Sequence, residues 1–132
     1  MGAGNQPNPV VLVVDDEALI RWSLSEGLAD AGYDVRNASS AAEAWAELAA
    51  CASTPLVVVL DLRLPDVSDF SLLRRIRTVR PDVPVLMLTA HGTADDVAEA
   101  RRLGAASFLQ KPFDIGEMVR LVGSAWKNQL PA

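Results

Sequence analysis

Cysteine and histidine are almost absent from this sequence of 132 residues, which has only Cys51 and His91 of these two types. A single thiol cannot form an internal disulfide, and one cysteine with one histidine cannot supply the four ligands of a structural zinc site. No apolar run approaches the roughly 20 residues that a membrane span needs. Residues 1–9 (MGAGNQPNP) lack the basic start and the apolar stretch of a signal peptide. We therefore expect a cytoplasmic protein without a membrane segment.

Basic residues are also scarce, since 12 Lys and Arg stand against 17 Asp and Glu, which gives a net charge of −5. This balance argues against direct binding of nucleic acid, because affinity for the phosphate backbone comes from clustered basic side chains. Apolar residues make up 50% of the chain, and a chain of this length buries about two thirds of its unfolded surface. One hydrophobic core, and so one domain, is expected.

Short apolar runs predict the strands of one sheet. The runs at residues 10–14, 56–60 and 85–88 are continuous rather than alternating, which is typical of parallel strands that are covered on both faces. Residues 107–110 form a fourth, more mixed run, and the polar residues 34–38 suit a strand at the edge of the sheet.

Helices are predicted between these strands from their start and stop signals. Gly32 and Gly104 are placed to end the first and fourth helices, and the second helix is expected over residues 41–50. Three helices open with a capping residue followed three positions later by an acidic one: Ser40 with Glu43, Thr93 with Asp96, and Asp114 with Glu117.

Each predicted helix also has an apolar face at helical spacing. On the third helix we expect the four arginines at positions 74, 75, 77 and 80 to form the solvated side. The apolar faces contain Ile20, Leu24, Gly27, Leu28 and Ala31; Ala44, Trp45 and Leu48; Leu72, Leu73, Ile76 and Val79; Ala94, Val97 and Ala100; and Ile115, Met118, Val119, Val122 and Trp126.

Strands that alternate with helices predict an α/β fold with a doubly wound, five-stranded parallel sheet and five helices. In such folds the functional crevice lies at the carboxyl ends of the strands. The residues at these ends are Asp15, Asp16, Asp61, Thr89 and Lys111.

The residues at the strand ends have the chemistry that phosphoryl transfer requires. Three carboxylates in one crevice repel each other, and oxygen ligands without nearby His or Cys suit a hard ion such as Mg²⁺. Asp61 can act as a carboxylate nucleophile while Asp15 and Asp16 hold the metal. The Lys111 ammonium and the Thr89 hydroxyl can then contact the remaining phosphoryl oxygens.

Four motifs together resemble the receiver domain of bacterial response regulators: VVLVVDDE, VVVLDLRLPD, VLMLTAHG and SFLQKPFD. The arginine of DLRLPD, the TAH and the KPFD further resemble receivers of the NtrC class. The resemblance implies the strand order 2-1-3-4-5. It covers a receiver domain over residues 10–127, with a tail at residues 1–9 and a tail or linker start at residues 128–132.

The resemblance also implies a role for each pocket residue. Asp61 corresponds to the phosphoacceptor, and Asp15 and Asp16 to the acidic pair that binds Mg²⁺, with Asp61 itself and the backbone carbonyl of Arg63 as further ligands. Lys111 corresponds to the lysine of the pocket, and the bond between Lys111 and Pro112 is expected to be cis. Thr89 and Phe108 correspond to the switch pair.

The implied function is a phosphorylation-dependent switch whose phosphodonor is a sensor histidine kinase. Its state would be relayed through the face formed by the fourth helix, the fifth strand and the fifth helix, which could also bind a second copy of the chain. An output domain outside this chain would regulate transcription. The alternative is a stand-alone receiver that acts by protein–protein interaction or phosphorelay. In either case the domain assists only its own phosphorylation and dephosphorylation and is not otherwise an enzyme.

The sequence departs from the family pattern at one loop, and one other protein class shares part of its chemistry. Ser68 and Asp69 stand where the family usually has Asp-Gly, so the backbone of this loop is open to question, and Asp69 is a candidate cap for the third helix. A haloacid-dehalogenase-type phosphatase, which also forms an aspartyl phosphate, is a remote alternative. Its second aspartate would fall at Glu17, and no cap insertion fits in 132 residues.

Overall fold

The structure, a computed structural model, describes residues 9–52 and 54–129. Residues 1–8 and 130–132, which make up most of the two predicted tails, lie outside this part. The strands are β1 (Val10–Val14), β2 (Asp34–Ala38), β3 (Leu56–Asp61), β4 (Val85–Thr89) and β5 (Ser107–Gln110). The helices are α1 (Ala18–Asp30), α2 (Ala41–Ala50), α3 (Ser71–Val79), α4 (Ala94–Arg102) and α5 (Ile115–Gln129).

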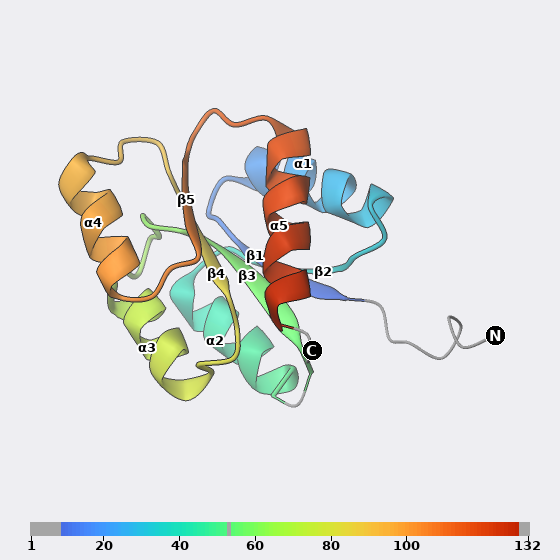
Figure 1. Ribbon diagram of the computed structural model, residues 1–132, viewed down its shortest axis with the longest axis horizontal. Helices are drawn as coiled ribbons and strands as arrows, with labels where there is room; N and C mark the ends of the chain where they lie inside the picture. Colours follow the sequence, from blue (N-terminus) through green and yellow to red (C-terminus); the bar gives the residue numbers. More distant parts are fainter. Residues whose placement is uncertain (1–8, 53, 130–132) are drawn as a thin grey trace.

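The five strands form one parallel sheet in the order β2-β1-β3-β4-β5 (Figure 1). This order and the predicted doubly wound fold are confirmed. The polar strand β2 lies at the edge of the sheet, where most of its side chains are at least partly exposed. The observed strands β3 and β4 extend one residue beyond the predicted runs, so that Asp61 and Thr89 are their last residues.

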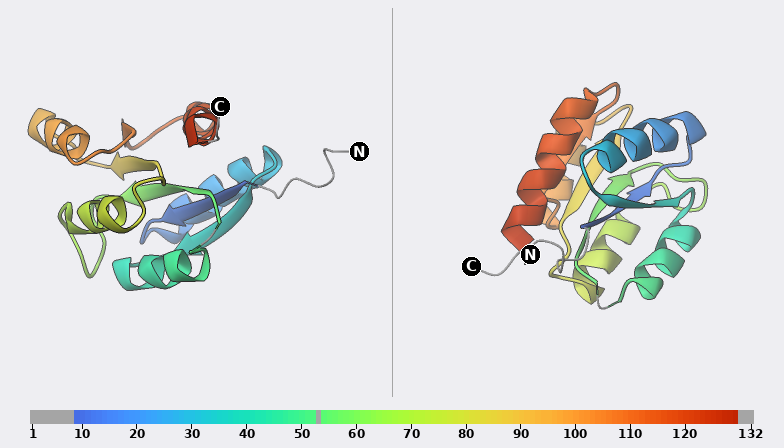
Figure 2. Two further views of the ribbon diagram at one scale, coloured as in Figure 1. Left: turned by 60° about the horizontal axis from the view of Figure 1, so that its bottom comes forward. Right: turned by 90° about the vertical axis from the view of Figure 1, so that its right-hand side faces the viewer.

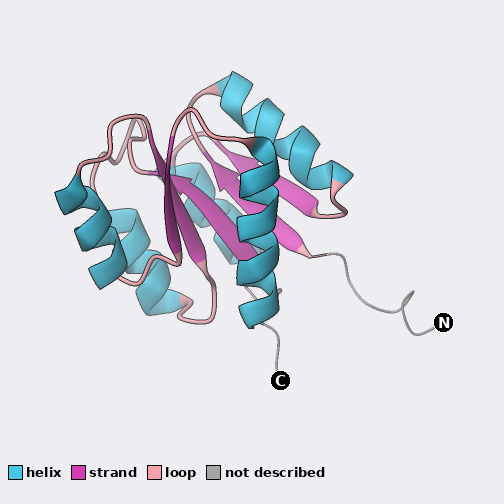
Figure 3. Cartoon of the chain, turned by 45° about the horizontal axis from the view of Figure 1, so that its top comes forward, coloured by secondary structure: helices cyan, strands magenta, loops and turns pink. Residues whose placement is uncertain are grey.

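Helices cover both faces of the sheet, which explains why the central strands are continuously apolar. In β1, Val10, Leu12 and Val14 pack into the core beneath α2 and α3, whereas Val11 and Val13 pack into the core beneath α1 and α5. Figures 2 and 3 show the two helical layers, with α4 beside β5. All five of these β1 side chains are buried, so the alternation that marks a half-exposed strand is absent.

The glycines predicted to end helices do so, and the predicted capping residues are confirmed in part. Gly32 and Gly104 adopt φ values of 99° and 98°, a conformation that other residues rarely adopt. Thr93 and Asp96 form the predicted capping box of α4. At α2, the Ser40 side chain accepts a hydrogen bond from the Glu43 N–H. The reciprocal bond is missing, because the Glu43 carboxylate accepts from the preceding serine, residue 39.

The predicted helix faces need five corrections. Arg77 is half-buried rather than on the solvated side, and its Nη1 donates to the Val83 carbonyl at 2.8 Å. Val79 is 56% exposed rather than packed, because it is the last residue of α3 and extends past the sheet. Ala31 and Ala94 are exposed because they lie at helix ends. Arg80 is not on the solvated side, since its guanidinium donates to the carbonyls of Cys51 and Thr54 and so ties α3 to the loop before β3.

The loop between β3 and α3 tolerates Ser68 and Asp69 without strain. No non-glycine residue in the described ranges has a positive φ, so the glycine usual in the family is not required here. The Asp69 Oδ1 accepts a hydrogen bond from the N–H of Ser71 at 2.9 Å. Phe70 occupies the N-cap position, so Asp69 caps α3 from one residue further out than the usual capping position.

Candidate functional site

The carboxyl ends of four neighbouring strands bring the predicted site residues together. Asp15 follows β1, Asp61 ends β3, Thr89 ends β4 and Lys111 follows β5. The Lys111 N–H donates to the Thr89 carbonyl at 2.8 Å, which continues the pairing of β4 and β5 up to the site. The peptide bond between Lys111 and Pro112 is cis, as expected.

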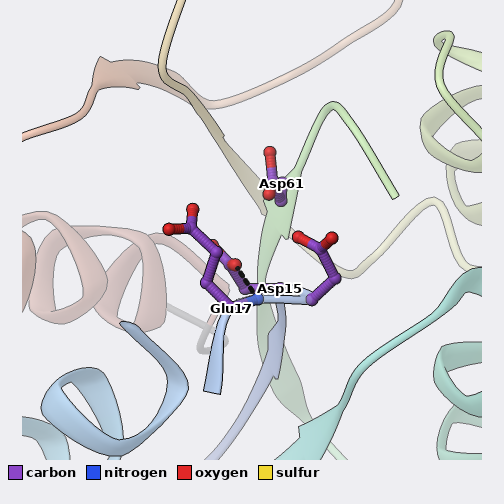
Figure 4. A group of neighbouring side chains, drawn as sticks. Asp15, Glu17 and Asp61 are labelled. Carbon is purple, nitrogen blue, oxygen red and sulfur yellow. Dashed lines mark hydrogen bonds between the residues drawn. The ribbon is translucent and has the colours of Figure 1, made fainter. Parts of the chain in front are cut away.

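Four carboxylates gather at this edge of the sheet. One oxygen from each of Asp15, Asp16, Glu17 and Asp61 lies within 4.8 Å of one from every other. Asp15 and Asp61 are buried, whereas Asp16 and Glu17 are exposed. Figure 4 shows the side chains of Asp15, Glu17 and Asp61 where β1 and β3 end. Acidic groups this close repel one another unless cationic groups balance them.

Lys111 supplies one such cation. Its Nζ lies 2.7 Å from Asp15 Oδ2, 2.8 Å from Glu17 Oε1 and 3.2 Å from Asp61 Oδ2. Only 9% of its side chain is exposed. Burial by itself would lower the pKa of the Lys111 ammonium, but its bonds to Asp15 and Glu17 outweigh this effect and raise the pKa above its usual value. Lys111 is therefore charged at neutral pH.

Asp61 has the environment of a reactive carboxylate. Burial raises the pKa of the Asp61 carboxyl, and the charge of Asp15 adds to this effect. The Arg63 N–H, which donates to Asp61 Oδ1 at 3.1 Å, and the Lys111 ammonium oppose the rise. The carboxylate is thus held by one backbone donor and one cation while its charge is incompletely balanced.

The backbone also orients the carboxylate that follows β1. Asp15 Oδ1 accepts from the Glu17 N–H at 2.8 Å, which is the bond dashed in Figure 4. The Asp15 carbonyl accepts from Arg21 Nη1 at 2.7 Å, so the first turns of α1 hold the end of β1. The side of the site formed by Asp15 is therefore held by β1 and α1.

The site opens to solvent as a cleft of about 260 Å³ lined by Asp16, Glu17, Asp61, Arg63, Ala90 and Lys111. Its donors are carboxylate and backbone oxygens without His or Cys, and their surplus of negative charge over the single lysine fits a hard divalent ion such as Mg²⁺. The structure brings the predicted residues Asp15, Asp16, Asp61 and Lys111 together. Thr89 is buried beside them and does not line the cleft. Sequence reasoning did not assign Glu17 to the site, although its position directly after Asp16 was a usable signal.

Thr89 and Phe108 lie on either side of Gly92, beside the site. Thr89 is fully buried, and its hydroxyl accepts from the His91 N–H at 3.3 Å. Phe108 is half-buried against the core on the α2 and α3 side. Gly92 lies between them, because a Cβ there would be 2.7 Å from both Phe108 Cε1 and Thr89 Cγ2. The Gly92 carbonyl accepts from Gln110 Nε2 at 2.6 Å, which ties this loop to β5.

The arrangement agrees with comparisons to known proteins. The profile of the response regulator receiver domain matches residues 11–123. The chain belongs to the response regulator receiver family. The match places this receiver in a signalling rather than a catalytic family, and the predicted resemblance is confirmed.

The relatives identify the class of regulator that this receiver resembles. The DNA-binding transcriptional regulator NtrC of Rhizobium meliloti (strain 1021) is 44% identical over 115 residues, which cover 87% of this chain and 23% of the relative. NtrC of Escherichia coli (strain K12) is 40% identical over 116 residues, covering 88% and 24%. The receiver therefore spans about a quarter of the length of these curated relatives.

A solved structure supports the same class. The solution structure of the beryllofluoride-activated NtrC4 receiver domain dimer has a TM-score of 0.85 and 34% identity, and the match covers 92% of this chain and 98% of that one. Within the described part of this receiver, no helix has the length and apolar character needed to cross a membrane.

Proposed function

We propose that this receiver is a phosphorylation-dependent signalling switch in which Asp61 accepts a phosphoryl group from a phosphohistidine of a sensor histidine kinase. The observation that carries the proposal is the Lys111 ammonium, 3.2 Å from the Asp61 carboxylate and surrounded by further carboxylates. A fixed cation beside a carboxylate nucleophile supports phosphoryl transfer, because negative charge is spread over the transferred oxygens there.

In the transfer, an oxygen of Asp61 forms the bond to phosphorus while the phosphorus–nitrogen bond of the donor breaks and its electron pair leaves with the imidazole. The contribution of the chain is to position these groups. The Arg63 N–H holds Asp61 Oδ1, and Lys111 Nζ is within reach of an oxygen of a phosphoryl group whose phosphorus is bound to Asp61 Oδ2. The Thr89 hydroxyl would contact another phosphoryl oxygen.

We assign Mg²⁺ as the cofactor, held by Asp15, Asp16, Asp61 and the backbone carbonyl of Arg63. When bound, the ion would neutralise the charge that the carboxylates and the incoming phosphoryl group bring together. The excess of carboxylates over cations in the pocket supports this assignment, because Lys111 already bonds to three of them. The remaining acidic group, Asp16, is exposed at the mouth of the cleft.

Removal of the metal should stop phosphorylation. With a small acyl phosphate and Mg²⁺, intact-mass spectrometry should show one added phosphoryl group, and with EDTA none. Asp16→Ala should raise the Mg²⁺ concentration for half-maximal incorporation by about tenfold, since even outer-shell losses weaken metal binding by that factor. Asp30→Ala, which removes an exposed aspartate at the far end of α1, should leave the Mg²⁺ requirement unchanged. Incorporation that persists in EDTA would contradict the metal assignment.

The partner that delivers the phosphoryl group must contact the rim of the cleft. Leu19 and Trp22, near the start of α1, are 77% and 63% exposed, and α1 begins directly after Glu17. An exposed apolar pair at this position supports binding of a protein donor, because large exposed apolar side chains that adjoin a site often mark interaction surfaces.

For the output, we propose transcriptional regulation in the cytoplasm through a domain outside residues 10–127. The NtrC relatives are DNA-binding transcriptional regulators that extend well beyond the matched region, which supports this choice over a stand-alone receiver. Dimerisation through α4, β5 and α5 is part of the proposal, and the dimeric state of the activated NtrC4 receiver supports it.

The switch pair would link the pocket to this face. Among the predicted inward residues of α4, only Ala100 is buried, while Val97 is half-buried. This helix therefore buries little apolar area and is held weakly. A shift of Thr89 toward the phosphoryl group would free space for the Phe108 ring, and a change of a few kcal/mol is enough to move such an equilibrium.

Beryllofluoride, which mimics the phosphoryl group, should change amide chemical shifts beyond the pocket. We expect changes at Phe108 and along α4 as well as at Asp61, and none of them in Asp61→Asn. Gly92→Ala should perturb Phe108 even without beryllofluoride, because the new Cβ would displace the ring. Changes that are confined to the pocket would refute the switch and leave the phosphoacceptor proposal intact.

A further inference from the structure

Asp66, in the loop between β3 and α3, binds the start of a helix that is distant in sequence. Its Oδ1 accepts from the Ala41 N–H at 2.8 Å and its Oδ2 from the Ala42 N–H at 3.0 Å. These are the first two amides of α2, which have no acceptor within the helix and favour a negative charge. The same two bonds lower the pKa of the Asp66 carboxyl, so this carboxylate is charged at neutral pH.

The two segments that Asp66 joins, the β3–α3 loop and the start of α2, are each connected to the pocket. On the loop side, Arg63 lies three residues before Asp66 and donates to Asp61 Oδ1 at 3.1 Å. On the α2 side, the Ala38 carbonyl at the end of β2 accepts from the Asp15 N–H at 3.1 Å. The bonds of Asp66 therefore complete a ring of contacts that connects Asp15 to Asp61 around the outside of the site.

Part of the β3–α3 loop is anchored by buried side chains, and part of it is exposed. Leu62 and Leu64 are buried in the core, and the Leu64 N–H donates to the Val67 carbonyl at 2.9 Å, which closes the turn that contains Asp66. Within that turn, Pro65 and Asp66 are exposed. The two bonds to α2 therefore fix the exposed middle of a turn whose ends, Leu64 and Val67, pack against the core.

We infer that Asp66 is a positioning residue for the pocket, which it stabilises by holding the β3–α3 loop, and with it the Arg63 backbone, against Asp61. Its carboxylate does not line the cleft and lies in the neighbouring hollow between α2 and α3, which Trp45 and Arg75 also line. It therefore acts through Arg63 and not by contact with a metal or phosphoryl group. The consequence for Mg²⁺ rests on the proposed function, whereas the consequence for the loop does not.

Asp69 provides a matched control in the same loop. It is also exposed, and its carboxylate also binds a helix N-terminus, but the amide it binds is that of Ser71, two residues away at the start of α3. Asp66→Ala and Asp69→Ala therefore remove the same charge and the same kind of cap. Only Asp66→Ala breaks the connection to α2.

Both variants should lower the midpoint of urea unfolding by similar amounts. Only Asp66→Ala should speed hydrogen exchange of the Arg63 amide and weaken Mg²⁺ binding, each by about tenfold, the usual effect of losing a residue that orients a ligand. Asp66→Asn keeps one acceptor oxygen, should recover part of both effects, and decides the test if the alanine variant does not fold.

The outcomes separate the two proposals. Equal exchange of the Arg63 amide in the two alanine variants would overturn the positioning role. Weaker Mg²⁺ binding without faster exchange would also overturn it, because the carboxylate would then act through its charge. If the unsubstituted chain takes up no phosphoryl group but exchange still separates the variants, the proposed function fails and the positioning role stands.

Discussion

Asp61→Asn should all but abolish phosphoryl incorporation, lowering its rate by a factor on the order of 10⁴, as when an enzyme loses a catalytic carboxylate. The amide keeps the size of the side chain and an acceptor for the Arg63 N–H, so the loop should be unchanged. It lacks the negative charge that makes the carboxylate a nucleophile. Intact-mass spectrometry after incubation with an acyl phosphate and Mg²⁺ measures the loss directly.

The control for this result is a second Asp→Asn substitution outside the pocket. Asp69→Asn keeps an oxygen acceptor for the Ser71 N–H and should incorporate as much phosphoryl as the unsubstituted chain. Peptide mapping should place the added mass on the segment that contains Asp61. Equal incorporation by Asp61→Asn would show that another carboxylate is the acceptor.

The fold and the pocket were predictable because they depend on features that lie within single segments. The continuous apolar run in β1 indicated a strand covered on both faces, and its side chains are buried on both sides of the sheet. Parallel strands end at one edge of a sheet, and the strand order that the resemblance implies makes four of these strands neighbours there. Asp15, Asp61, Thr89 and Lys111 lie at the ends of these four strands.

The features that sequence reasoning missed depend on contacts between segments whose relative placement no local pattern encodes. The Arg80 side chain reaches the carbonyl of Cys51, 29 residues away, and the Asp66 side chain reaches α2, 25 residues away. Helical spacing placed Val79 on the apolar face of α3, but it could not show that the core ends before that residue, where its side chain is 56% exposed. Loop geometry decides the first two, and the position of α3 relative to the sheet decides the third.

Lys111→Ala should destabilise the metal-free fold at neutral pH by about 3 kcal/mol, the usual effect of removing one partner of a buried ion pair. The ammonium forms ion pairs with three carboxylates, and two of these, Asp15 and Asp61, are buried. Without it, neither of these two carboxylates has an ion pair among the described residues. Urea unfolding in EDTA measures the loss, and Mg²⁺ should restore most of it because the ion supplies the missing positive charge.

The loss should shrink as the pH falls. Burial and then the charge of Asp15 already raise the pKa of Asp61 above its usual value, and removal of Lys111 raises it further. A carboxyl whose pKa is higher in the folded than in the unfolded state binds more protons when folded, so the free energy of unfolding rises on acidification. Between about pH 7 and about pH 4, where carboxyls titrate, the variant should recover stability relative to the unsubstituted chain.

A double variant distinguishes lost charge balance from lost packing of the lysine stem. Asp61→Asn in the Lys111→Ala background leaves Asp15 as the one buried carboxylate of the described pocket, so repulsion falls and most of the lost stability should return. Lys111→Met keeps the apolar stem without the charge, and should be about as unstable as Lys111→Ala at pH 7. If the methionine variant were as stable as the unsubstituted chain, Lys111 would hold the pocket by packing. The role of its ammonium would then be limited to contact with the phosphoryl group.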